Sequence, residues 1–216
     1  MMKKVKFIVF ICLFILLPLA YFNGFIRISD LTSEQESIAK KYGGVYVFDE
    51  KLEKEIDKRE EERDKVNKEI LKEVSNIQDK EEQNKQLRLL LQERFYDNPK
   101  LERVLSNGKK YYSRKDNIKI DNYKILNNYE EKLKEFMGKD YDKYENYLSI
   151  NLGYFYIDND TIVPISIGVS TLYTEVTFGL YGDEASGIKF TKESTQRLIG
   201  DNKFYLTDNK FQKINK

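Results

Sequence analysis

The chain opens with a long apolar run and then becomes strongly polar. Residues 7–22 contain no charged side chain, and three lysines precede them. Extended to residue 26, the run reaches about 20 residues, the length that a hydrocarbon core of about 30 Å requires of a helix. The pattern predicts a signal-anchor or transmembrane segment over residues 1–27 that contacts the membrane through residues 7–26. The lysines place the N-terminus in the cytoplasm and the rest of the chain outside it.

Two other interpretations of this segment remain open. A cleaved signal peptide would place Ala20 before the cut, but Pro18 then occupies the position that favours a small residue. A lipid-modified Cys12 would need small residues before it, whereas Val9, Phe10 and Ile11 are bulky. We therefore prefer a permanent anchor and interpret Cys12 as an ordinary apolar residue.

Residues 28–48 follow as a juxtamembrane linker. Capping-box patterns start at Thr32 and at Ser33 and predict a short helix. The glycine pair that begins at Gly43 ends this helix. Residues 45–48 are apolar and fit either a strand added to a later sheet or the lead-in to the next helix.

Residues 49–96 form the most polar part of the chain. They contain no Pro and no Gly and are rich in Glu, Lys, Gln, Arg and Leu, which favour helix. The sequence predicts one helical stalk about 70 Å long. A heptad pattern from Leu52 to Leu91 is apolar at both ends and polar between them, so a solvated stalk and a coiled coil remain alternatives. The charged block 57–65 is interpreted as a solvated face.

Residues 97–216 are predicted to form one α+β extracytoplasmic domain. Pro99 breaks the stalk, and residues 101–105 are assigned to a short helix in preference to a hairpin centred on Asn107 and Gly108. A helical zone over 121–147 is interrupted at a glycine. The sequence of 216 residues leaves room for one such globular domain and not two.

The last third of the chain has the alternation of apolar and polar residues that is typical of strands. Strands are expected at 149–157, 162–170 and 171–182, followed by a short helix that starts near Thr191 or Ser194. A small hairpin closes the chain. The predicted fold class is therefore α+β, with a small antiparallel sheet of three to five strands and helices packed on one face.

Composition limits the chemistry of the chain. Its 37 basic and 36 acidic residues nearly cancel, so a nucleic-acid partner is not expected. Histidine is absent and Cys12 is the single cysteine, which excludes Ser/His and Cys/His catalysis and any intrachain disulfide. We expect no catalytic residue, no cofactor and no metal site, and we predict that the protein is not an enzyme.

Three local features of the sequence are candidate sites. Asp158, Asn159 and Asp160 offer oxygen ligands for calcium, but the spacing lacks the later Gly and Glu of an EF-hand, so a hairpin turn is preferred. The basic and aromatic run 109–115 fits an anionic partner or, as the simpler interpretation, a solvated loop. The small side chains of strand 162–170 admit a close neighbour, most simply a helix of the same domain.

The acidic residues Glu175, Asp183 and Glu184 are the only close carboxylates of the sheet region. A glycosidase-like mechanism needs two carboxylates that flank the scissile bond. These residues therefore carry the alternative hypothesis, an anchored or secreted enzyme that acts on an envelope polymer.

The leading hypothesis is a bacterial, membrane-anchored protein that acts by protein–protein interaction in the envelope. It is either a scaffold subunit or an immunity-type protein that neutralises a toxin, and its stalk is a candidate for self-association. A face of one charge sign would favour toxin binding, whereas a continuous coiled-coil seam with an unpaired sheet edge would favour a scaffold. A ligand sensor would need an apolar pocket under the sheet.

Overall fold

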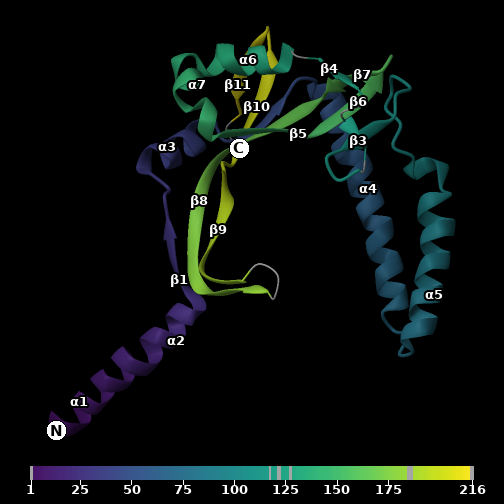
Figure 1. The fold of residues 1–216 in the computed structure, drawn as a ribbon. Helices are drawn as coiled ribbons and strands as arrows, with labels where there is room; N and C mark the ends of the chain where they lie inside the picture. The colour runs from purple at the N-terminus through teal and green to yellow at the C-terminus, as the bar shows by residue number, and fades with distance from the viewer. Residues whose placement is uncertain (1, 117, 121–122, 127, 184–186, 215–216) are drawn as a thin grey trace. The chain divides into compact units, whose positions relative to one another are not determined.

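The computed structural model describes residues 2–116, 118–120, 123–126, 128–183 and 187–214. Helices and strands both contribute to it (Figure 1). The chain divides into two compact units. Unit 1 contains residues 1–44, 144–149 and 169–201, and unit 2 contains residues 45–143, 150–168 and 202–216.

The apolar run near the N-terminus forms three short helical segments in succession. They are α1 (Met2–Ile11), a π-helical turn (Cys12–Leu16) and α2 (Leu17–Phe22), and the chain then continues as strand β1 (Asn23–Ser29). Across the described residues, no helix combines the length and the apolar character that crossing a membrane requires.

The predicted transmembrane segment over residues 1–27 is therefore wrong. The single-pass localisation, with a cytoplasmic N-terminus and an extracytoplasmic C-terminal domain, is wrong with it. The prediction treated residues 7–26 as one apolar helix. In the structure, α1 includes the three lysines, and residues 23–27 are extended as part of β1.

Unit 1 is built around a long antiparallel hairpin. Strand β8 (Ser166–Asp183) pairs with β9 (Gly187–Ile199) from Ser170 opposite Ile199 to Asp183 opposite Gly187, with an irregularity after Phe178. Strand β1 pairs antiparallel with the other edge of β8. The strands β1, β8 and β9 thus lie side by side in this order (Figure 1). The helix expected near Thr191 is wrong, because residues 187–199 are strand β9.

Helix α3 (Ser33–Tyr42) of the same unit has the predicted ends. The backbone N–H of Gln35 donates to the Thr32 hydroxyl at 3.2 Å, and the Thr32 N–H donates to the Gln35 side-chain oxygen at 2.7 Å. This reciprocal pair is the predicted capping box, and Gly43 is the C-cap. Gly43 and Gly200 approach each other so closely that a Cβ built on Gly200 would lie 2.3 Å from the carbonyl oxygen of Gly43.

The predicted stalk is two helices in unit 2, and the prediction of one continuous helix is wrong. Helix α4 covers Glu50–Val74 and α5 covers Lys80–Leu91, followed by a π-helical turn at Gln92–Tyr96. Asp79 caps α5 by accepting a hydrogen bond from the N–H of Glu82 at 2.8 Å. The two helices contact each other along the hairpin that they form (Figure 1). The coiled-coil alternative, a seam from Leu52 to Leu91, is therefore interrupted between the two helices.

The helix expected over 101–105 is also wrong. A 3-10 turn (Pro99–Leu101) is followed by a hairpin in which the N–H of Leu105 donates to the Lys109 carbonyl at 2.9 Å. Gly108 has a φ of 77°, which a residue with a side chain rarely adopts. The hairpin alternative, centred on Asn107 and Gly108, is the one that forms.

Unit 2 contains a four-stranded sheet with the strand order β3-β6-β7-β4. This sheet is separate from the sheet that contains β8, so the prediction of a single sheet is wrong. Its strands are β3 (Tyr111–Ser113), β4 (Lys124–Ile125), β6 (Tyr154–Asp158) and β7 (Thr161–Pro164). β4 and β7 are parallel, and the other pairs are antiparallel. Strand β5 (Leu148–Leu152) precedes β6 in the chain.

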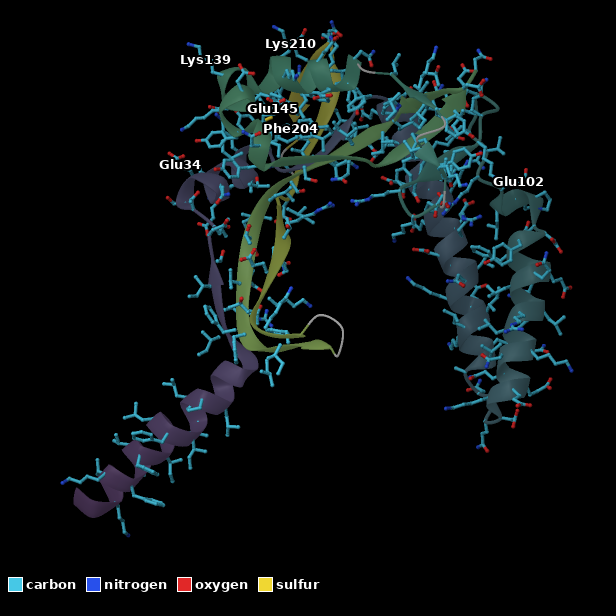
Figure 2. All side chains as sticks on the ribbon, viewed as in Figure 1. Glu34, Glu102, Lys139, Glu145, Phe204 and Lys210 are labelled. Carbon is cyan, nitrogen blue, oxygen red and sulfur yellow. The ribbon has the colours of Figure 1, made fainter. Side chains whose placement is uncertain are left out.

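The remaining elements of unit 2 enclose an aromatic core. Helices α6 (Asn128–Met137) and α7 (Lys139–Tyr144) are separated at Gly138, as predicted, and β2 (Gly44–Val47), β10 (Asn202–Thr207) and β11 (Lys210–Lys213) are adjacent in this order. Tyr46 stacks on Phe204, labelled in Figure 2, with ring centroids 4.5 Å apart. The rings of Phe136 and Phe211 lie within 6 Å of Tyr46.

Candidate functional site

A group of charged side chains in mutual contact lies where α4 meets the hairpin 103–113. A carboxylate oxygen of Glu60, on α4, accepts a hydrogen bond from the Tyr111 hydroxyl at 2.7 Å. The same oxygen accepts from Nε of Arg103 at 3.0 Å. Tyr111 is fully buried, beside Leu52 and Ile56 of α4. The apolar packing of Tyr111 thus brings its hydroxyl to Glu60.

Arg103 extends this network to a second carboxylate. Its Nη1 donates to both oxygens of Asp116, at 2.8 and 3.0 Å. Asp116 also accepts from the N–H of Ser113 at 2.7 Å and from the Ser113 hydroxyl at 3.1 Å. Glu60, Arg103 and Asp116 therefore form a continuous chain in which negative and positive charges alternate. We call these three residues and Tyr111 the α4 charge network.

The environment shifts the pKa values within the α4 charge network. Burial raises the pKa of the Tyr111 phenol well above its ordinary value, and the hydrogen bond to Glu60 and the negative charge of Glu60 raise it further. Burial alone would raise the pKa of Asp116. The hydrogen bonds from Ser113 and the positive charge of Arg103 outweigh burial and lower it. Tyr111 is thus protonated and Asp116 ionised at neutral pH.

This arrangement favours holding two elements together over catalysis. A general acid or base needs a pKa near the working pH, and the pKa shifts of Tyr111 and Asp116 both point away from neutrality. Each carboxylate of the network already accepts hydrogen bonds from Arg103. We therefore infer that the α4 charge network holds the segment 103–116 against α4.

Sequence reasoning missed the α4 charge network. Glu60 belongs to the block 57–65, which was interpreted as a solvated face, and its partner Tyr111 is 51 positions away. Charge pattern alone gives no signal for such a contact. The apolar residues that pack around the ring of Tyr111 come together only in the fold.

Arg63 lies one helical turn after Glu60, and its Nε is 3.5 Å from a carboxylate oxygen of Glu60. Its guanidinium lies over the ring of Phe95, with the central carbon 4.4 Å from the ring centroid. Its Nη1 also donates to the carbonyl oxygen of Leu101. This cation–π contact joins α4 to the π-helical turn after α5.

The carboxylates of the enzyme hypothesis do not come together as a pair. Glu175 lies within β8, where its carboxylate is 3.6 Å from Nη1 of Arg27 on β1. Asp183 is the last residue of the same strand. Eight positions of extended chain span about 26 Å, whereas a glycosidase pair needs about 5–10 Å. Glu184 lies outside the described residues.

The acidic turn 158–160 closes the hairpin between β6 and β7, as the sequence predicted. Asp158 pairs with Thr161, and Asn159 and Asp160 have φ values of 46° and 59°. Positive φ at both central residues is typical of a type I′ turn, which is favoured in hairpins with a two-residue loop. Nζ of Lys109 lies 2.6 Å from Asp158. Within the described part of the chain, no group of three or more metal-ligating side chains is present.

The basic run 109–115 separates into inward and outward side chains. Tyr111 points into the core, and Lys109 pairs with Asp158. Lys110 lies 5.9 Å from the ring centroid of Tyr112. Arg114 and Lys115 are exposed. The run is therefore not a single basic surface.

Strand β9 is the second candidate site, because its outer edge has no partner strand. Among the described strands, β9 pairs with β8 alone over its 13 residues. Every residue from 187 to 193 is exposed, and Ile188 and Phe190 have 72% and 55% of their surface accessible. Figure 2 shows side chains projecting from both sides of the β8–β9 ribbon. The outward N–H and C=O groups of such an edge are available to another strand.

Comparison with known proteins gives no relative for either site. No protein-family model matches the chain, no curated protein matches it, and no solved structure matches it.

Proposed function

We propose that the protein acts by protein–protein interaction and binds an extended segment of a partner along the outer edge of β9. The observation that carries this proposal is the length of exposed edge that β9 leaves without a partner strand. In this mode of recognition, main-chain hydrogen bonds supply affinity, and alternate side chains supply specificity.

The side chains of β9 indicate the chemistry of the partner. Ile188 and Phe190 lie on one face of the strand, two positions apart, and are exposed. Opposite them, β-branched or aromatic side chains of a partner strand would bury apolar surface. Lys189, Lys192 and Arg197 outnumber the one acidic residue of β9, Glu193. The partner segment therefore alternates apolar residues with acidic ones.

A scaffold role is favoured over neutralisation of a toxin. An unpaired sheet edge is the feature expected of a chain that joins other proteins. The exposed surface of α4 carries both charge signs, whereas a toxin-neutralising surface was expected to have one. Because α4 and α5 are two separate helices, they do not form one continuous coiled-coil seam. The scaffold proposal therefore depends on the exposed edge of β9.

Site-specific cross-linking tests this proposal. The photoreactive residue p-benzoylphenylalanine replaces Ile188 in the full chain, and adducts are formed in the cell that makes the protein. We expect a discrete adduct whose cross-linked peptide is an alternating apolar and acidic segment. The matched control carries p-benzoylphenylalanine in place of Lys210, an exposed residue of β11 that is labelled in Figure 2. This control should give no such adduct.

A charge-reversal variant shows whether the adduct depends on β9. The double substitution K189E/K192E reverses the charge of the strand without removing a buried group. We expect it to abolish the adduct at position 188, and we expect K210E to leave that adduct unchanged. An adduct that persists in K189E/K192E, or one that forms equally from position 210, would contradict strand recognition at β9.

A further inference from the structure

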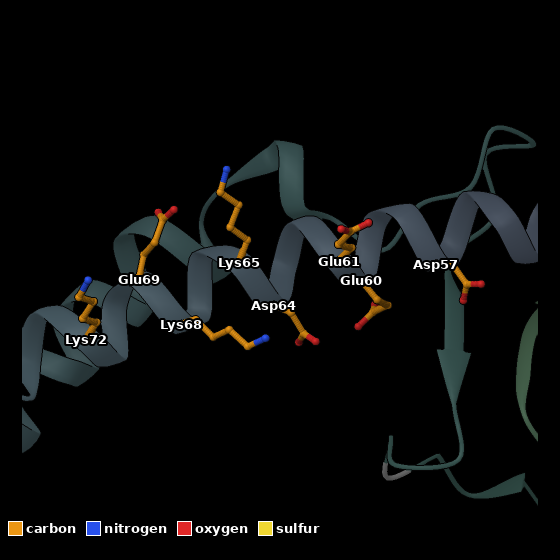
Figure 3. Close-up of a pocket in the computed structure, with 8 residues that line it drawn as sticks. All are labelled: Asp57, Glu60, Glu61, Asp64, Lys65, Lys68, Glu69 and Lys72. Carbon is orange, nitrogen blue, oxygen red and sulfur yellow. The ribbon is translucent and has the colours of Figure 1, made fainter.

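One face of α4 carries charges that are arranged symmetrically about its middle. Eight side chains of this helix line a shallow, open depression of about 670 Å³ (Figure 3). In chain order they are Asp57, Glu60, Glu61, Asp64, Lys65, Lys68, Glu69 and Lys72. Acidic residues occupy the first half, and all three lysines lie in the second half.

The positions pair about the point between Asp64 and Lys65. Asp64 is then related to Lys65, Glu61 to Lys68, and Asp57 to Lys72, so each of these three acidic residues has a basic counterpart. The six side chains are all exposed. The arrangement is therefore charge-complementary to itself under a two-fold rotation.

The one pair of like charges is already neutralised within the chain. Glu60 and Glu69 are related by the same symmetry. Arg103 contacts Glu60 at 3.0 Å, and Arg94 lies 3.9 Å from Glu69. The repulsion that these two glutamates would exert across a symmetric contact is thus reduced.

The lysines of this face have no ion-pair partner of their own. Among the described residues, no acidic side chain lies within 4.0 Å of Nζ of Lys65, Lys68 or Lys72. The helix dipole favours acidic residues in the first turn and basic ones in the last, and its influence falls off beyond those turns. α4 begins at Glu50, so the dipole does not account for charges at positions 57–68.

We infer that this face of α4 binds a second copy of the chain in an antiparallel, two-fold symmetric contact. In that orientation, the acidic half of each α4 lies against the basic half of the other. A parallel contact would place like charges together. Complementary charges select the orientation and steer the association, which should therefore weaken with added salt.

Two complementary variants test the inference. E61K/D64K makes the face basic, and K65E/K68E makes it acidic. Each variant alone should be monomeric in sedimentation equilibrium of the full chain at low salt, with association at least about tenfold weaker than in wild type. An equimolar mixture should recover the dimer, because Glu61 is related to Lys68 and Asp64 to Lys65, and the two variants exchange these charges.

The mixture separates a specific contact from a folding defect. A variant that failed to fold would not regain dimerisation when it is mixed with its counterpart. E81K/E131K, which changes two exposed glutamates outside the face, makes the same change in net charge and should remain dimeric. The inference is overturned if wild type is monomeric at low salt, if either variant alone stays dimeric, or if the mixture does not associate.

Discussion

The hydroxyl of Tyr111 donates a hydrogen bond to Glu60 at 2.7 Å, from a side chain that is 0% exposed. Its apolar ring packs with Leu52 and Ile56 of α4, while its polar end meets a carboxylate of the same helix. This one residue therefore joins the hairpin 103–113 to α4 by packing and by a charge-assisted hydrogen bond.

Removing the Tyr111 hydroxyl should destabilise the fold. The substitution Tyr111→Phe keeps the ring and removes the donor, and a hydrogen bond to a charged group contributes about 1.5–3 kcal/mol. We expect the free energy of unfolding to fall by about 2 kcal/mol in urea denaturation. Tyr96→Phe is the control, because Tyr96 is 65% exposed and the change should be close to neutral. Equal losses in both variants would contradict the role assigned to the contact.

The contribution of Tyr111 should also depend on alkaline pH. Its pKa in the folded chain is raised above the ordinary 10.0, by burial first and then by Glu60. The stabilisation is then fully present below pH 10 and is lost as pH rises further, because the unfolded chain releases the proton first. The free energy of unfolding of Tyr111→Phe should therefore fall less steeply above pH 10 than that of wild type. Parallel pH profiles of the two proteins would refute this.

Asp116 should make an acid-sensitive contribution. Burial opposes its ionisation, but hydrogen bonds from Ser113 and the charge of Arg103 lower its pKa below the ordinary 3.8. A lowered pKa gives stability that is present above pH 4 and lost as pH falls through the folded value. Asp116→Asn should therefore be less stable than wild type at pH 7, and the difference should shrink below pH 4. A constant difference between pH 7 and pH 2 would argue against an ionised Asp116.

The ion pair between the buried Glu53 and Lys203 can be tested with a double-mutant cycle. Nζ of Lys203 lies 2.5 Å from Glu53, whose side chain is 6% exposed. Lys203→Met leaves this charge buried without its cation and should cost about 3 kcal/mol of unfolding free energy. Glu53→Gln in the Lys203→Met background should recover most of that loss, since it removes the unpaired charge. Additive losses in the double variant would show that the two residues are not coupled.

Two glycines, Gly168 within β8 and Gly200 just after β9, should respond differently to alanine. A Cβ on Gly200 would lie 2.3 Å from backbone oxygens of Ala39 and Gly43, whereas a Cβ on Gly168 would meet nothing within 4 Å. Gly200→Ala should therefore cost about 1–3 kcal/mol through overpacking, and Gly168→Ala should change stability little. Thermal unfolding of both variants decides this. A tolerated Gly200→Ala would mean that the end of α3 shifts readily.

Local signals in the sequence predicted several elements correctly. The capping box at Thr32, the interruption at Gly138 and the hairpin turn at Asn159 each depend on residues that are close in the chain. The break between α4 and α5 had a local signal too, in the capping pattern of Asp79 and Glu82. It was overlooked because the segment contains no Pro and no Gly, the usual interruptions of a helix.

Other features depend on tertiary structure and could not be predicted from spacing. The contact between Glu60 and Tyr111 requires the hairpin 103–113 to pack on α4. The edge position of β9 follows from the strand order, and its residues 191–198 fit a capped helix in isolation. The N-terminal prediction was wrong for a different reason. It counted apolar residues and did not anticipate that the chain would become extended at Asn23.

The most direct test of the proposed function is amide hydrogen exchange along β9. The probe is a synthetic peptide with the sequence of the segment cross-linked at position 188. We predict that the outward-facing amides of β9 exchange at least about tenfold more slowly with the peptide bound, because a paired strand protects them. The exchange of β1, which among the described strands also pairs with β8 alone, should not change. Peptide binding that leaves the amides of β9 unprotected would contradict recognition at this edge.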